Sequence, residues 1–164
     1  MKGSADSVLA KRKSWALAVA GALLALPISG CSSFDRDWEA HEKPAAPAPG
    51  LEGHWEGSWT SEANGHTGGL RCILARKEGD TYEARYYATY SWCVFTFGFE
   101  YSVPMTAVKE NGVWAFHGNA ELSCWIGGGK YDYEGLATET VYSAKYRSSD
   151  DHGVFKMGRV KETP

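Results

Sequence analysis

The chain has 164 residues, of which 43% are hydrophobic and 13% aromatic, and it carries 17 Lys and Arg against 20 Asp and Glu. A length of this order suits one domain. The slightly acidic balance excludes the basic surface that a nucleic-acid-binding protein needs. The composition therefore predicts one modest domain and no nucleic-acid partner.

The first thirty residues have the features of an export signal. Four basic residues precede an apolar run from Trp15 to Leu26, which is short for a membrane span and typical of a signal-peptide core. The run ends in Ile28-Ser-Gly-Cys31, which resembles the bacterial lipobox, the motif at which a cysteine is acylated and becomes the mature N-terminus. We therefore expect residues 1–30 to be a lipoprotein signal peptide and Cys31 to carry palmitate-type acyl chains. An ordinary secretory signal or an uncleaved anchor is the alternative.

The resemblance to lipoproteins also implies a location. Ser32 stands where an Asp would follow the acylated cysteine of an inner-membrane lipoprotein, so the implied location is the outer membrane, facing the periplasm. Removal of residues 1–30 leaves 13 Lys and Arg against 19 Asp and Glu. With a net charge of −6, the mature chain would be held on the membrane by its acyl chains rather than by its surface charge.

Residues 31–50 contain little that could be buried. Their second half includes Pro44-Ala-Ala-Pro-Ala-Pro-Gly50, a composition typical of an extended linker. We expect a lipidated, disordered tether here, which could reach about 60 Å at ~3.1 Å per residue.

Residues 51–164 are expected to form an all-β domain. The clearest strand is Thr81 to Ser91, where Tyr82, Ala84, Tyr86, Ala88 and Tyr90 alternate with polar residues. Seven more short runs of the same kind are separated by Gly, Asn and Asp, and cover residues 54–60, 70–74, 95–108, 113–120, 130–137, 142–147 and 154–160. Eight strands joined by short connections predict an antiparallel up-and-down barrel, with a two-sheet sandwich as the alternative.

Three motifs carry a resemblance to known proteins. Gly53-x-Trp55 is similar to the motif that opens lipocalin-like and avidin-like barrels, which belong to the calycin type. Residues 53–59, 64–70 and 142–146 resemble a group of uncharacterised bacterial envelope lipoproteins, and the likeness covers residues 51–160. This resemblance implies a small calycin-type barrel and brings no function with it.

Three cysteines lie in the expected domain. In a meander, the connections after the third and fifth strands are at the same end of the barrel. Cys93 lies in the first of these and Cys124 in the second, so we expect them to form a disulfide and Cys72 to be a small buried residue. Three free thiols, or a bond that involves Cys72, are the alternatives.

No pattern of catalytic or metal-binding residues emerges. The chain has no Gly-x-Ser-x-Gly motif, and the histidines of the domain have no paired ligand spacing. The acidic residues of the expected strands fall on their solvent faces, at Glu83, Glu100, Asp132 and Glu134. We therefore expect no catalytic residue, no metal and no cofactor.

The aromatic residues are the unusual part of the composition. Either they fill the barrel, or they line a cavity for a small amphipathic ligand. The candidate ligand-binding residues are Trp55, Trp59, Tyr82, Tyr86, Tyr90, Trp92, Phe97, Tyr131, Tyr133 and Tyr142. The sequence thus predicts a non-catalytic, membrane-anchored module that binds a small amphipathic or hydrophobic molecule at the barrel mouth near Trp92 and Trp125. The alternative is a protein-interaction or enzyme-inhibitor module, docked on an envelope protein, whose barrel is filled.

Overall fold

The computed structural model describes residues 33–40, 50–123 and 128–160, and within these it leaves only the side chain of Trp92 undescribed. The expected signal peptide, the acylation site Cys31 and the expected disulfide partner Cys124 lie outside the described residues.

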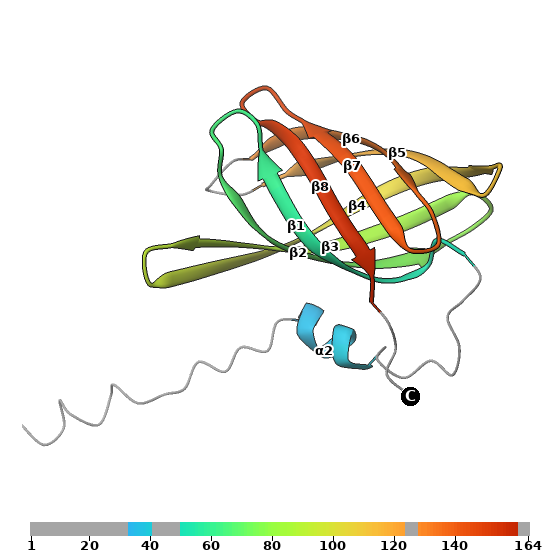
Figure 1. The fold of residues 1–164 in the computed structure, drawn as a ribbon, viewed down its shortest axis with the longest axis horizontal. Helices are drawn as coiled ribbons and strands as arrows, with labels where there is room; N and C mark the ends of the chain where they lie inside the picture. The colour runs from blue at the N-terminus through green and yellow to red at the C-terminus, as the bar shows by residue number, and fades with distance from the viewer. Residues whose placement is uncertain (1–32, 41–49, 124–127, 161–164) are drawn as a thin grey trace, which may run out of the picture. The chain divides into compact units, whose positions relative to one another are not determined.

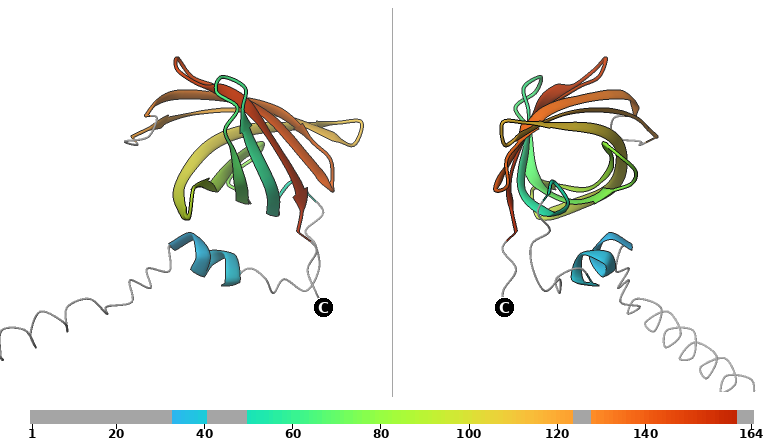
Figure 2. Two further views of the ribbon diagram at one scale, coloured as in Figure 1. Left: turned by 60° about the vertical axis from the view of Figure 1, so that its left-hand side comes forward. Right: turned by 90° about the vertical axis from the view of Figure 1, so that its right-hand side faces the viewer.

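Eight antiparallel strands follow one another in a simple meander. Their bounds are β1 Gly53–Ser61, β2 Thr67–Arg76, β3 Thr81–Trp92, β4 Phe95–Glu110, β5 Val113–Leu122, β6 Gly129–Ala137, β7 Val141–Arg147 and β8 His152–Arg159. Each strand pairs with the next, and β8 pairs with β1 from Trp55↔Arg159 to Ser61↔Gly153, which closes the barrel (Figures 1 and 2). The predicted eight-stranded barrel is confirmed, and the alternative of a two-sheet sandwich is wrong.

Small residues lie next to large ones inside the barrel. On β3, the buried side chains alternate between large and small, with Tyr82 and Tyr86 next to Ala84 and Ala88. At Gly135 on β6, a Cβ atom would lie 2.5 Å from the ring of Phe116 and 2.2 Å from a carbonyl oxygen of β7. The small residues therefore make room for the rings that neighbouring strands send into the interior.

One end of the barrel is filled with side chains. Leu51 and Trp55 are fully buried there, and the Trp55 indole N–H donates a hydrogen bond of 3.1 Å to the Leu51 carbonyl oxygen. The guanidinium of Arg159 lies 4.4 Å from the Trp55 ring centre. The segment before β1 thus covers this end, which we call the closed end.

The other end is asymmetric because β4 continues beyond the point where its pairing with β5 stops. The two strands pair only from Met105↔Gly118 to Glu110↔Val113, and residues 95–104 of β4 pair with β3 alone. Pro104, which has no N–H to donate to a ladder, lies at the point where the pairing stops. The β3–β4 hairpin therefore projects past the barrel (Figure 1).

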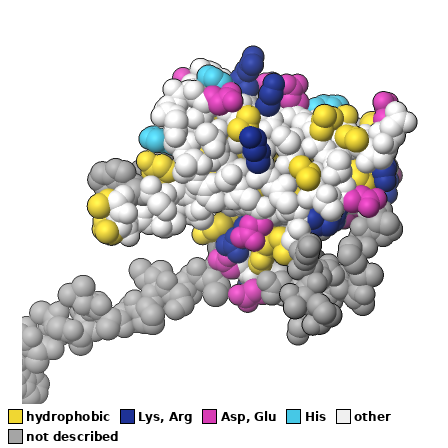
Figure 3. All heavy atoms as spheres, in the orientation of Figure 1, with side chains coloured by type: hydrophobic (Ala, Val, Ile, Leu, Met, Phe, Trp, Pro, Cys, Tyr) yellow, Lys and Arg dark blue, Asp and Glu magenta, His cyan; other side chains and the backbone are white. Residues whose placement is uncertain are grey.

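The projecting hairpin corrects one sequence-based expectation. Phe97 shares the inward parity of Tyr101 and was expected to line the interior, but it is 42% exposed. The reason is that β4 pairs with β3 alone at this height, so no β5 residue lies beside Phe97. Val94 and Phe95 at the tip are 83% and 59% exposed, and apolar side chains gather at this end in Figure 3.

A second correction concerns the expected tether. Ser33–Ala40 form a helix, α2, whose Phe34 and Trp38 are one turn apart and both buried. Phe34 stacks on Tyr87 of β3 at 5.3 Å, and the guanidinium of Arg71 lies 5.0–5.4 Å from the rings of all three residues. Of the expected disordered segment, this part is therefore ordered against the barrel wall.

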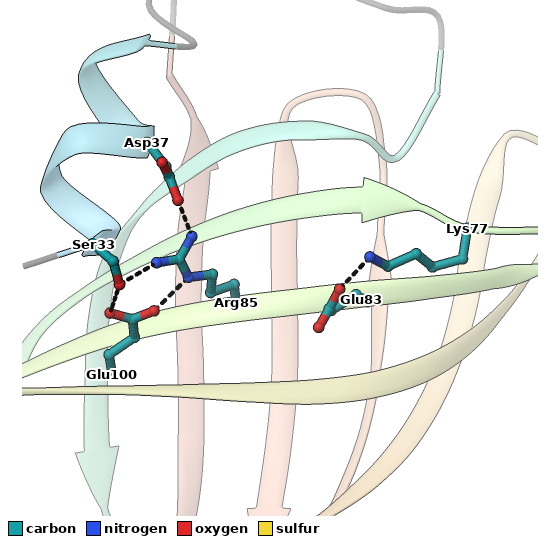
Figure 4. A network of polar contacts seen from close by, with 6 residues as sticks. All are labelled: Ser33, Asp37, Lys77, Glu83, Arg85 and Glu100. Carbon is teal, nitrogen blue, oxygen red and sulfur yellow. Dashed lines mark hydrogen bonds and ion pairs between the residues drawn. The ribbon is translucent and has the colours of Figure 1, made fainter.

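Ion pairs surround this apolar contact. Asp35 of α2 pairs with Arg71 at 2.8 Å. Arg85 of β3 pairs with both Asp37 of α2 and Glu100 of β4, as Figure 4 shows. Ser33 accepts a hydrogen bond from Arg85 at 2.9 Å and donates one to Glu100. The side chains of Arg85 and Glu100 are thus used on the outer face of the barrel.

Candidate functional site

A cavity of about 790 Å³ lies at the end of the barrel opposite the closed end. It falls in the usual range for ligand sites, roughly 300–1,000 Å³. Eight of its seventeen lining residues are Trp, Tyr or Phe, and they come from six strands. These residues are Trp59, Tyr90, Phe99, Tyr101, Tyr131, Tyr133, Tyr146 and Phe155.

The cavity opens where β4 and β5 part. Its lining includes Glu100 and Ser102 from β4 and Glu121 and Ser123 from the end of β5. Because the ladder between these strands stops at Met105↔Gly118, their remaining lengths form two separate edges. The missing pairs thus provide a lateral entrance in addition to the mouth of the barrel.

A layer of tyrosines forms the floor of the cavity. Tyr86 is fully buried and stacks on Tyr101 at 5.2 Å and on Tyr133 at 6.3 Å. Tyr101 and Tyr133 share a hydrogen bond, and burial raises the pKa of both hydroxyls above the ordinary tyrosine value. The floor is therefore uncharged at neutral pH and still offers hydroxyl groups.

One carboxylate belongs to the wall. Asp151 lies between β7 and β8, half-buried, and accepts a 2.6 Å hydrogen bond from the Ser61 hydroxyl and a 3.1 Å bond from the Tyr146 hydroxyl. Burial raises the pKa of Tyr146, and the negative charge of Asp151 raises it further. Asp151 thus holds the ends of β1 and β7 together at the cavity wall.

The ten candidate ligand-binding residues divide among several places. Four of them line the cavity, namely Trp59, Tyr90, Tyr131 and Tyr133. Four others are buried outside its lining, namely Trp55, Tyr82, Tyr86 and Tyr142. Phe97 lies on the projecting hairpin and is not part of the wall. The side chain of Trp92 is not described.

Several wall residues were not among the candidates. Phe99, Tyr101, Tyr146 and Phe155 have the inward parity that the sequence shows, but parity does not indicate height along the barrel axis. Asp151 lies in a turn, where no periodic pattern marks it. A depth along each strand, counted from the turns of the open end, could have found the four aromatic residues.

The remaining expectations concern sulfur, metals and membrane spans. Cys72 is buried, as expected, and Cys93 is exposed at the β3–β4 turn with a φ of 57°. Its expected bond to Cys124 stays a prediction, because Cys124 lies outside the described residues. In the described ranges, no three His, Cys, Asp or Glu side chains are grouped as a metal site would require. Among those same residues, no helix has the length and apolarity to cross a bilayer.

The chain was compared with protein-family models, with curated proteins and with solved structures, and no match was found in any of the three. The cavity and its wall are therefore the basis for assigning a function.

Proposed function

We propose that this protein is a cell-envelope lipoprotein whose barrel binds a small amphipathic or hydrophobic molecule in the open-end cavity. The observation that carries the proposal is the cavity itself, about 790 Å³ in volume and walled by eight aromatic rings. Apolar walls with a few polar groups are typical of small-molecule sites. The closed end supports this role, because its packed side chains give the cavity a firm floor.

The proposed anchor is the acylated Cys31, preceded by a cleaved signal peptide, in the outer membrane. Its support is the lipobox-like motif together with the basic and apolar segments before it. Only Ser32 separates Cys31 from α2, which is packed on the barrel. The anchor would therefore hold the barrel close to the membrane, rather than at the end of a long tether.

We propose binding without catalysis. A catalytic site needs titratable groups that converge on one position. In the described part of the cavity wall, the tyrosines of the floor are held neutral by burial. Cys72, which lies outside the lining, is buried with its pKa raised. Glu100 is held on the outer face by Arg85.

The test is a titration with a neutral fluorescent probe, N-phenyl-1-naphthylamine. Binding should be saturable in the intact protein and should be lost in Ala88→Trp, because Ala88 lines the cavity and the new indole would fill it. Ala115→Trp is the matched control, since Ala115 is exposed on the outside of β5. If both variants bind the probe as the parent does, the cavity is not the binding site. Native mass spectrometry of protein from its own host would then identify any co-purifying molecule.

A second candidate function is docking on another envelope protein. The observation that favours it is the projecting hairpin, where Val94, Phe95 and Phe97 are exposed together. A photo-crosslinking residue at position 95 or 97 should give the same discrete adduct in intact cells. Position 141 is the control, because Val141 is also apolar and exposed but lies at the closed end. Equal adducts at all three positions would contradict this role.

A further inference from the structure

We propose that the cavity selects an organic cation, such as an amine or a quaternary ammonium with an apolar body, and disfavours fatty acids and other anions. This inference rests on the proposed function, in which the cavity is a ligand site, and adds the charge of the ligand to it. The positive group would lie near Asp151 and Glu121, and the apolar body among the aromatic rings.

Acidic residues outnumber basic ones in the described wall. The described lining includes three acidic residues, Glu100, Glu121 and Asp151, and one histidine, His66, and it includes no Lys or Arg. A ligand in this cavity would therefore lie close to carboxylates, with no Lys or Arg in the described lining.

The three carboxylates differ in the groups that they contact. Glu100 is neutralised by Arg85 on the outer face. No ion pair of the described residues involves Asp151 or Glu121, although Lys130 lies directly across from Glu121 on β6. The two hydrogen bonds that Asp151 accepts, from Ser61 and Tyr146, fix its position without neutralising its charge. A carboxylate has about four lone-pair sites, so Asp151 can accept further bonds from a ligand.

The aromatic rings of the wall also favour a cation. The face of an aromatic ring is electron-rich and attracts a cation within about 6 Å of its centre. At Tyr146 an aromatic ring and a carboxylate lie together, because the ring belongs to the wall while the hydroxyl donates to Asp151. An aromatic wall beside a fixed carboxylate is an arrangement that recognises ammonium groups. An anion would face repulsion from the same groups, and the described wall offers it no Lys or Arg.

The experiment compares three ligands that share one phenylalkyl body and differ in charge: 4-phenylbutyltrimethylammonium, 5-phenylpentanol and 5-phenylpentanoate. Binding to the full chain is measured by isothermal titration calorimetry at low and moderate salt. The cation should bind about tenfold more tightly than the alcohol, and the carboxylate more weakly than both. The advantage of the cation should shrink as salt is added.

Variants locate the effect. Glu121→Gln and Asp151→Asn should each reduce the advantage of the cation over the alcohol several-fold, and leave the affinity for the alcohol unchanged. Glu134→Gln is the matched control, since Glu134 is an exposed carboxylate on the outside of β6. Asp151 also holds two strands, so folding of its variant is checked by circular dichroism. Glu121 is exposed and makes no ion pair with another described residue, so its variant provides the test even if the Asp151 variant fails to fold.

The outcomes keep the two proposals apart. If the alcohol or the carboxylate binds as tightly as the cation, the charge preference is overturned and the ligand site stands. If the cation binds best but Glu121→Gln and Asp151→Asn bind it like the parent, the assignment to these carboxylates is overturned. If none of the three ligands binds and Ala88→Trp leaves probe binding unchanged, both the charge preference and the proposed function fail.

Discussion

The hydroxyl oxygens of Tyr86 on β3 and Tyr142 on β7 lie 2.6 Å apart inside the barrel, and both side chains are fully buried. The pair joins opposite walls across the interior. It lies in the filled layer, and Tyr86 stacks on two of the rings that form the floor of the cavity.

Removing one hydroxyl of this pair should be costly. Tyr86→Phe leaves the Tyr142 hydroxyl with only the Met105 sulfur at 3.8 Å, and Tyr142→Phe leaves the Tyr86 hydroxyl without its partner. Each change should lower the free energy of unfolding by about 1–3 kcal/mol. The double variant should cost less than the sum, because neither hydroxyl of the pair is then left buried without the other. Urea denaturation of the four proteins measures this coupling, and strictly additive losses would contradict it.

Because of these two tyrosines, we expect the folded protein to lose stability at alkaline pH. Burial raises the pKa of Tyr86 and of Tyr142 well above the ordinary value of 10. A group whose pKa is higher in the folded than in the unfolded chain contributes its full stabilisation below the unfolded pKa. The free energy of unfolding should therefore be unaffected by these groups below pH 10. Above pH 10, each should lower it by up to about 1.4 kcal/mol per pH unit.

Urea denaturation at several pH values between 8 and 11.5 tests this dependence. The double variant Tyr86→Phe/Tyr142→Phe supplies the comparison, since it lacks both titrating hydroxyls. Its slope above pH 10 should be shallower than that of the parent protein. Parallel slopes would mean that these two hydroxyls do not resist ionisation in the folded state.

The attachment of α2 predicts a local effect. An isolated two-turn helix is unstable in water, so α2 depends on its contacts with the barrel. Phe34→Ala removes a fully buried ring that stacks on Tyr87, a change that typically costs about 3–5 kcal/mol. Amide hydrogen exchange over residues 33–40 should therefore become fast, while the strands keep their protection.

Phe95→Ala is the matched control for this experiment. Phe95 is 59% exposed at the hairpin tip, so its removal should leave exchange over α2 unchanged. Slow exchange of residues 33–40 in Phe34→Ala would show that the ring does not hold the helix.

Alkylation followed by mass spectrometry tests the cysteines of the domain. Cys72 is buried and burial raises its pKa, so it should react only after unfolding. With the predicted Cys93–Cys124 bond intact, the folded domain should take up no label at either residue without reductant, and two labels after mild reduction. Labelling of exposed Cys93 without reductant would contradict the bond.

The barrel could be predicted from the sequence because its pattern is local. Alternation at Tyr82, Ala84 and Tyr86 gives each strand a buried face, and the short turns order the strands into a meander. The burial of Leu70, Cys72 and Leu74 follows from the same rule. The lipoprotein signal is also read from the sequence alone, and it stays a prediction because it lies outside the described residues.

The tertiary structure decided which part of the barrel is filled and which is hollow. Tyr86 and Tyr90 have the same parity on one strand, yet Tyr86 is in the packed layer and Tyr90 lines the cavity. Their difference is one of height, which depends on where β4 and β5 stop pairing. Likewise, α2 is too short to be stable by itself, and its place depends on Tyr87, Arg71 and Arg85, residues distant in sequence. Local patterns determine faces, whereas cavities and docking depend on contacts between distant segments.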